Sequence, residues 1–258
     1  MTRDRLRTMF EEVPELYDQA RPSYPDDLFA GLVRLAQLRH GARILEIGCG
    51  TGKATVALAE RGFEVVCVEL GEQLVAVARR NLARFPRVRV VNEPFETCEE
   101  VGFSAVAAFT AWHWIDPTLR YERAARALVV GGHLAVVSTQ HVLPEDGDEF
   151  FAEVQADYAA MTNAEDRPPP RPENVPDFGN EIEASGHFAN VAVRRYVWDV
   201  EYSADEYIAL LDTYSGHRAL EEERRARLYE RIRGRIDARA GRAVRKTYLA
   251  TLNVARQR

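Results

Sequence analysis

The chain has 258 residues, of which 46% are hydrophobic and 29% charged, as is typical of a folded globular protein of one large or two small domains. Its formal net charge of −6 argues against a protein that binds polyanions nonspecifically through an excess of positive charge. Three cysteines without CxxC spacing argue against a disulfide framework and a zinc site. Because no apolar run is long enough to cross a membrane, we expect a cytoplasmic protein without a targeting segment.

The first half of the chain alternates short apolar runs with amphipathic segments. The apolar runs predict buried strands, and the segments between them place apolar residues at the three- and four-residue spacing of a helix. Strands are expected at 43–47, 64–69, 88–91, 104–109 and 133–137, and helices at about 2–17, 25–38, 53–61, 71–84 and 119–128. This alternation predicts a doubly wound α/β sheet.

The pattern loosens after residue 140. Helices are expected at 149–161, 204–213 and 221–240, and strands at 191–200 and 247–254. The proline-rich segment 167–176 predicts an exposed loop, because proline lacks an amide donor and fixes φ.

The helix expected at 221–240 is rich in arginine. Leu228, Ile232 and Ile236 recur at four-residue spacing with arginines between them. This spacing favours an apolar stripe with a solvated basic face. Nucleic-acid binding by that face is the less favoured alternative.

The most informative segment is 44–53, ILEIGCGTGK, a predicted strand that turns directly into a helix. Gly48, Gly50 and Gly52 lack Cβ atoms, so a ligand can rest on the backbone beside the helix N-terminus. The spacing is GxGxG, since Lys53 stands where a dinucleotide-binding fold would have its third glycine, and the lysine-serine pair of a phosphate-binding loop is missing. A glycine turn with a purely structural role is the alternative.

An acidic residue ends the second predicted strand. Glu69 closes the run 64–69, and a carboxylate at this place in a doubly wound sheet can accept both hydroxyls of a ribose. A solvated glutamate at a strand end is the alternative interpretation.

With the glycine loop and Glu69, the sequence resembles the class I S-adenosylmethionine-dependent methyltransferases over roughly residues 14–140. Residues 17–25, YDQARPSYP, and 111–116, AWHWID, more narrowly resemble the branch of trans-aconitate-type and related bacterial small-molecule methyltransferases. The resemblance implies a doubly wound, seven-stranded mixed sheet with an N-terminal helical lid and a C-terminal helical cap. It divides the chain into a lid (1–40), a cofactor-binding core (41–140) and a substrate cap that includes the last two strands (141–258).

The resemblance also implies which residues hold the cofactor, S-adenosylmethionine. It assigns the methionine part to Glu46 and the three glycines of the loop, the ribose to Glu69, and the adenine to the space between Leu70 and Phe95. The remaining cofactor residues that it implies are Tyr17 and Arg21 from the lid, and Thr110 and Ala111 after the fourth strand. Relatives often have an aspartate that receives the adenine amino group; here Pro94 matches that position, and Glu96 is the expected substitute.

The acceptor site is indicated less sharply. Methyl transfer from a sulfonium is an in-line displacement, so the protein mainly supplies alignment and exclusion of water, and no metal is needed. His113 is the candidate catalytic base, with a cofactor or substrate contact and simple packing as its alternatives. Candidate substrate contacts are Trp112, Trp114, Tyr214 and His217.

The predicted function is methyl transfer to an oxygen, less readily a nitrogen or carbon, of a small metabolite or short peptide, with a carboxylate as one candidate acceptor. A protein that binds S-adenosylmethionine without transferring methyl, as a sensor or scaffold, is the main alternative. A nicotinamide oxidoreductase is disfavoured by the missing third glycine, and a nucleic-acid methyltransferase by the lack of an Asn-Pro-Pro-Tyr segment. No membrane partner is expected, and the sequence indicates no oligomeric state.

Overall fold

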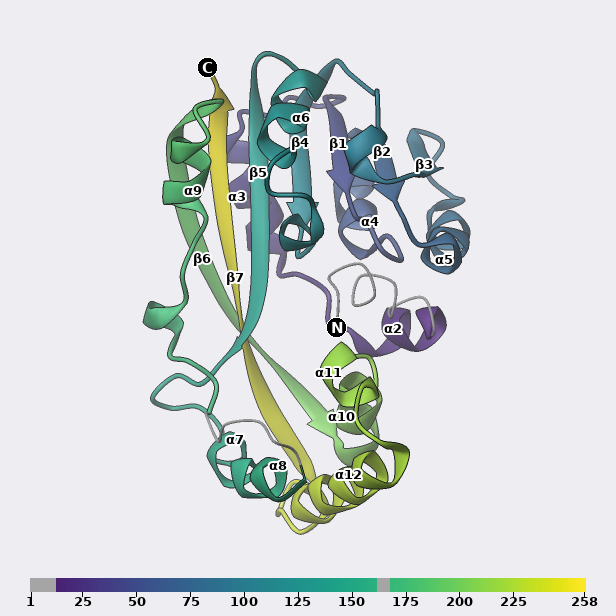
Figure 1. The fold of residues 1–258 in the computed structure, drawn as a ribbon, viewed down its shortest axis with the longest axis vertical. Helices are drawn as coiled ribbons and strands as arrows, with labels where there is room; N and C mark the ends of the chain where they lie inside the picture. Colours follow the sequence, from purple (N-terminus) through teal and green to yellow (C-terminus); the bar gives the residue numbers. More distant parts are fainter. Residues whose placement is uncertain (1–12, 162–167) are drawn as a thin grey trace.

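The computed structural model describes residues 13–161 and 168–258, which form one seven-stranded mixed sheet with helices on both faces. The strands are β1 (Arg43–Ile47), β2 (Glu64–Glu69), β3 (Val88–Asn92), β4 (Phe103–Phe109), β5 (Leu128–Val142), β6 (Phe188–Ser203) and β7 (Ala243–Gln257). Their order across the sheet is β3-β2-β1-β4-β5-β7-β6, with β1 to β5 parallel and β7 antiparallel to both of its neighbours (Figure 1). The predicted fold class is therefore confirmed.

The described helices lie on the two faces of the sheet, in the lid and in the cap. Those of the lid and core are α2 (Pro14–Ala20), α3 (Asp26–Leu35), α4 (Lys53–Glu60), α5 (Glu72–Leu82), α6 (Arg120–Ala127) and α9 (Gly179–Ala184). The cap helices are α7 (Phe150–Glu153), α8 (Gln155–Met161), α10 (Ala204–Leu211), α11 (Ser215–Arg218) and α12 (Glu222–Asp237). Short 3-10 turns occur at η2 (Phe95–Thr97), η3 (Trp112–Trp114) and η4 (Pro172–Asn174).

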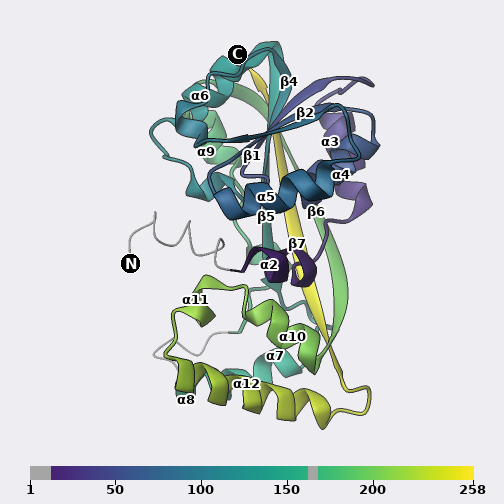
Figure 2. The same cartoon turned by 90° about the vertical axis from the view of Figure 1, so that its right-hand side faces the viewer.

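Each face of the sheet has its own apolar core. Helices α3, α4 and α5 bury their apolar sides against one face, and α6 and α9 against the other (Figure 2). The alternate residues of β1 show the division, since Ile44 packs on the α3 side and Leu45 on the α6 side.

Strands β5, β6 and β7 are much longer than β1 to β4. They have 15, 16 and 15 residues, and they run past the edge of the core to carry the helical cap (Figure 1). A third apolar cluster fills the cap, with Phe150 from α7, Leu210 from α10, Ile232 from α12 and Tyr248 from β7 among its members. Helix α2 lies between the core and the cap (Figure 2).

Several elements differ from the sequence prediction. The helix expected at 2–17 lies partly outside the described residues, and α2 begins at Pro14 and ends at Ala20. The fifth strand was expected to end at Val137, where the apolar run stops, but its pairing with β7 continues to Val142 because backbone hydrogen bonds do not depend on side-chain polarity. Helix α9 was not predicted.

The arginine-rich helix α12 matches its predicted pattern. Leu228, Ile232 and Ile236 are fully buried. Its arginines form ion pairs within the cap, such as Arg231 with the buried Asp157, so much of its positive charge is already compensated. None of the described helices is both apolar enough and long enough to span a bilayer.

Candidate functional site

Two adjoining cavities lie at the carboxyl ends of the parallel strands, where the chain order reverses between β1 and β4. Doubly wound sheets bind their ligands at this point. The first, here called the loop cavity, has a volume of about 570 Å³ and is lined by residues that include Gly50, Glu69 and Phe95. The second, the cap cavity, has a volume of about 650 Å³ and is lined by residues that include Tyr214 and Lys246.

The glycine loop leaves bare backbone at the junction of the two cavities. Gly48, Gly50 and Gly52 have φ values of 64°, 57° and 90°, which side chains rarely allow. A Cβ atom on Gly48 would lie 2.6 Å from the Cβ atom of Ala111, whereas one on Gly50 would meet nothing closer than a Tyr17 ring atom at 3.9 Å. A side chain at Gly48 would therefore collide with Ala111, whereas a side chain at Gly50 would occupy open space at the wall of the two cavities.

Glu69 is held in place by backbone amides. Its two carboxylate oxygens accept hydrogen bonds from the amides of Gly50 and Gly71, each at 2.9 Å, and the residue is 9% exposed. Glu69 also lines the loop cavity. This geometry fits the expected contact with ribose hydroxyls.

Glu46 is a buried acid with an unused oxygen. The residue is 1% exposed, and its Oε2 has no hydrogen-bond partner among the described residues. Burial raises the pKa of Glu46 to about 8; a hydrogen bond from Thr55 opposes this shift, and the nearby Glu69 adds to it. An unpartnered acceptor at this depth fits a cationic donor on a ligand, such as the ammonium of a methionine moiety.

The part of the loop cavity expected to hold the adenine differs from the sequence prediction. Leu70 and Phe95 line it as expected, and Glu93 lies with them. Glu96, the expected substitute for the missing aspartate, does not line the cavity, and its Oε1 accepts a hydrogen bond from the Asp116 amide at 3.3 Å. The turn after β3 thus brings Glu93, rather than Glu96, to the wall of the loop cavity.

The Trp-His-Trp turn is divided between the core and the loop cavity. Trp112 was predicted to contact substrate. It is instead 1% exposed and packs on Tyr121, because its apolar ring joins the core cluster between the sheet and α6. His113 and Trp114 line the loop cavity, not the cap cavity, and their rings lie 4.6 Å apart. Burial lowers the pKa of His113, and the Arg120 charge acts in the same direction.

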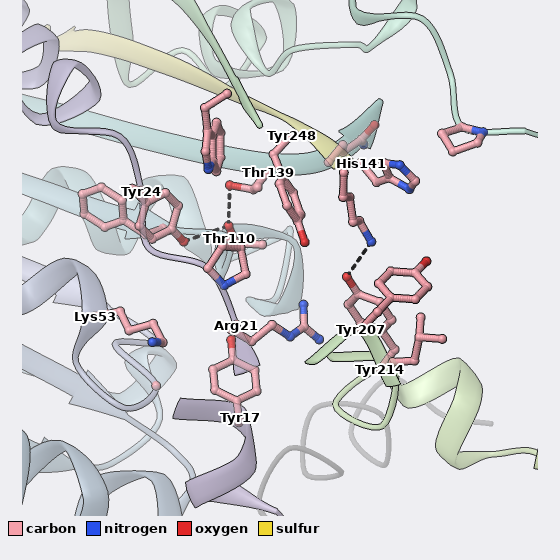
Figure 3. A pocket seen from close by; sticks show the side chains of 18 of the residues that line it. Tyr17, Arg21, Tyr24, Lys53, Thr110, Thr139, His141, Tyr207, Tyr214 and Tyr248 are labelled. Atoms are coloured by element: carbon pink, nitrogen blue, oxygen red, sulfur yellow. Dashed lines mark hydrogen bonds between the residues drawn. The ribbon is translucent and has the colours of Figure 1, made fainter. Parts of the chain in front are cut away.

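The predicted lid residues join the two cavities to the cap. Tyr17 and Arg21 line both cavities. Arg21 donates from Nε to the Thr213 hydroxyl at 2.8 Å, and its guanidinium lies 4.3 Å from the ring centre of Tyr214 (Figure 3). Arg21 therefore ties the segment after α2 to the cap.

Three hydroxyls meet where the cavities join. Thr110 follows β4 with φ of 56°, a strained value for a β-branched residue, and such strain is concentrated at functional sites. Its hydroxyl forms hydrogen bonds with Tyr24 at 3.0 Å and with Thr139 at 3.2 Å (Figure 3). Sequence reasoning found Thr110 and Ala111, and Ala111 lines the loop cavity, but it missed Tyr24 and Thr139.

The predicted substrate contacts Tyr214 and His217 both line the cap cavity. The Tyr158 hydroxyl lies 3.0 Å from Nε2 of His217, and burial lowers the pKa of that histidine to about 4. Burial raises the pKa of Tyr214, but the charges of Lys246 and Arg21 outweigh burial and leave it below its usual value.

Lys246 was not predicted. It donates to the Tyr214 hydroxyl at 3.0 Å. The only signal for Lys246 in the sequence is the rarity of lysine, since Lys53 and Lys246 are the two lysines of the whole chain. In the structure both line the cap cavity.

Comparison with known proteins agrees with this architecture. Residues 44–132 match the family model described as a methyltransferase domain. An uncharacterised methyltransferase of Mycobacterium tuberculosis is 36% identical over 121 residues, which are 47% of this chain and 48% of the relative. The match thus spans about half the length of these curated relatives.

Solved structures share the fold over almost the whole chain. A protein of Anaeromyxobacter dehalogenans, provisionally described as a type II methyltransferase, aligns with a TM-score of 0.64 and 22% identity, covering 92% of this chain and 97% of that chain. Phosphoethanolamine N-methyltransferase 2 of Haemonchus contortus, solved with S-adenosyl-L-methionine, aligns with a TM-score of 0.55 and 18% identity, covering 98% of this chain and 59% of that chain. Residues 44–132 therefore match a methyltransferase domain, and the chain shares its fold with these methyltransferase structures.

Proposed function

We propose that the protein transfers a methyl group from S-adenosylmethionine, bound in the loop cavity, to an oxygen atom of a small molecule bound in the cap cavity. The observation that carries this proposal is the junction of the two cavities, which share Tyr17, Arg21, Gly50, Thr110 and Thr139 in their walls. A donor and an acceptor in such adjoining cavities are held close and shielded from water, which is most of what this displacement requires.

The residues of the loop cavity, together with Glu46 in the wall of the adjoining cap cavity, fit the cofactor part by part. The unpartnered oxygen of Glu46 suits an ammonium, Glu69 suits ribose hydroxyls, and the bare backbone of Gly50 leaves space for the chain between them. When bound, the cofactor supplies an electrophilic methyl group on a sulfonium. Glu93, Leu70 and Phe95 are proposed to receive the adenine.

The cap cavity favours a small acceptor over a macromolecule. Its volume of about 650 Å³ lies within the range of small-molecule sites, and it is roofed by the helical cap. The arginines of α12 are engaged by acids, as in the pair of Arg233 with Asp205, so this helix offers little uncompensated charge to a nucleic acid. The narrower likeness to trans-aconitate-type enzymes stays a prediction.

An oxygen acceptor fits the hydroxyl cluster at the junction. Thr110, Thr139 and Tyr24 can donate to and accept from an acceptor oxygen, and their mutual hydrogen bonds hold them in place. Arg21, through its bonds to Thr213, keeps the lid against the cap and so excludes water from the reacting atoms. A carboxylate acceptor is already ionised near neutral pH and would require no base.

The cofactor assignment is tested by binding and turnover. S-adenosylhomocysteine at a hundredfold excess over its Kd should stabilise the native state by about 2.7 kcal/mol and raise the Tm by roughly 5–10 °C. Gly50→Val should abolish this shift, because the valine side chain would fill the open space beside Gly50 in the loop cavity. No shift for the wild type would refute the proposal. Binding without transfer of labelled methyl to any acceptor from a metabolite extract would favour a sensor instead.

The adenine contact is tested by two glutamates that lie three positions apart. Glu93→Ala should raise the Kd for S-adenosylhomocysteine by about 3–10-fold, since a half-buried hydrogen bond to a carboxylate is lost. The matched control Glu96→Ala should leave the Kd within twofold, because Glu96 lies outside the cavity. Isothermal titration calorimetry measures both, and the reverse pattern would restore Glu96 as the adenine contact.

Glu46 predicts proton release on cofactor binding. With a pKa of about 8 the free carboxyl is mostly protonated at pH 7, and a bound ammonium favours its ionised form. Binding of S-adenosylhomocysteine at pH 7 should therefore release about 0.5–1 proton, measured from titrations in buffers of different ionisation enthalpy. Glu46→Gln should release almost none; equal release by both proteins would mean that the proton comes from another group.

His113 is proposed to contact the cofactor, because it lines only the loop cavity. His113→Ala should raise the Kd for S-adenosylhomocysteine by about 3–10-fold and leave kcat at saturating cofactor within twofold. The exposed His187, which lines neither cavity, provides the control variant His187→Ala. A loss of kcat by roughly 10²–10⁴ with unchanged cofactor affinity would instead make His113 a catalytic base.

A further inference from the structure

One buried cation in the cap cavity has no carboxylate partner. Lys246 is 2% exposed, and among the described residues it forms no ion pair. Its Nζ donates to the Tyr214 hydroxyl and lies over the rings of Tyr207, Tyr214 and Tyr248, at 5.6, 5.1 and 5.3 Å from their centres. A hydroxyl and ring faces stabilise an ammonium, but they do not neutralise its charge.

A second polar group in the same cavity lacks a partner. Nε2 of His141 is buried, with no hydrogen-bond partner among the described residues. His141 pairs with Tyr248 across β5 and β7, and Lys246 lies two residues from Tyr248, so the three side chains share one face of the sheet. Burial lowers the pKa of His141 to about 2, so its neutral ring can carry a proton on Nε2 and donate one hydrogen bond.

The described wall of the cap cavity carries more positive than negative charge. Its cationic residues are Arg21, Lys53 and Lys246, and its one carboxyl group is Glu46. Without a ligand, burial keeps Glu46 mostly protonated at neutral pH, as its raised pKa shows; once ionised by the ammonium of a bound cofactor, it forms a neutral pair with that ammonium. A ligand with a negative charge would complement such a wall, since a buried charge is stable only when it is paired.

The walls around Lys246 are aromatic. Trp198 stacks on Tyr248 with ring centres 5.4 Å apart and planes inclined by 24°, and Phe151 and Tyr158 line the same cavity. Flat aromatic faces pack best against another ring. The cavity thus combines a planar apolar wall with a small cluster of anion-binding donors.

We propose that the methyl acceptor is a small aromatic carboxylate whose acid group binds Lys246 Nζ, Tyr214 Oη and His141 Nε2. This inference rests on the proposed function and names the substrate class of the same site. Lys246 and Tyr214 do not line the loop cavity, so the acid anchors the far end of the acceptor. The aromatic ring of the acceptor then extends from its acid group toward Thr110 and Thr139, where the two cavities meet.

The first test compares acids with their amides on wild-type protein saturated with S-adenosylhomocysteine. The probes are benzoate, phenylacetate and 3-phenylpropionate with the corresponding primary amides, titrated calorimetrically at pH 7. At least one acid should bind about tenfold or more tightly than its amide, because a charge-assisted hydrogen bond is lost in the amide. If S-adenosylhomocysteine binds but no acid is preferred, the inference fails alone; if S-adenosylhomocysteine does not bind, the proposed function fails with it.

The second test assigns the preference to one lysine. Lys246→Met should lower the acid affinity about tenfold or more and leave the amide affinity within twofold, which removes the preference. The matched control Lys53→Met removes the other lysine of the cavity and should keep the preference. Circular dichroism and the S-adenosylhomocysteine Kd check folding, with Lys246→Gln as the second variant if Lys246→Met is unfolded. A preference that survives loss of Lys246, or is lost with Lys53, would overturn the assignment.

Discussion

The antiparallel pairing of β5 with β7 is the constraint on which the rest of the structure depends. Ten consecutive pairs, from His133 with Arg256 to Val142 with Thr247, continue past the end of the parallel sheet. This pairing supports the cap, and it sets Thr139 and His141 on the same face as Lys246 and Tyr248. A shorter β5 would still complete the core, but it would remove Thr139 and His141 from the wall of the cap cavity.

Three buried ionisable groups at the site differ in how well the protein satisfies them. Glu69 receives two backbone amides, Glu46 keeps an unused oxygen, and Lys246 has a hydroxyl in place of a counterion. Unsatisfied buried groups cost stability, so a fold retains them where a ligand completes them. On this basis the cap cavity offers an acceptor for a cation at Glu46, beside the glycine loop, and a donor for an anion at Lys246.

The lid connects these two ends. Arg21 lines both cavities, donates hydrogen bonds to Thr213 in the cap and lies over the ring of Tyr214, whose hydroxyl accepts a hydrogen bond from Lys246. A molecule bound in either cavity would therefore face Arg21, a residue that also lines the other cavity. In the proposed function, loosening Arg21 would open the reacting atoms to water.

The sequence by itself determined the sheet, the glycine loop and Glu69, because apolar runs, helical spacing and positive-φ glycines are local signals. Only the tertiary structure decided that Trp112 belongs to the core, that Glu93 and not Glu96 reaches the cavity, and that Lys246 lies beside Tyr214. Those outcomes depend on the direction of a turn of a few residues, or on pairing between strands about a hundred residues apart, and no local pattern encodes either.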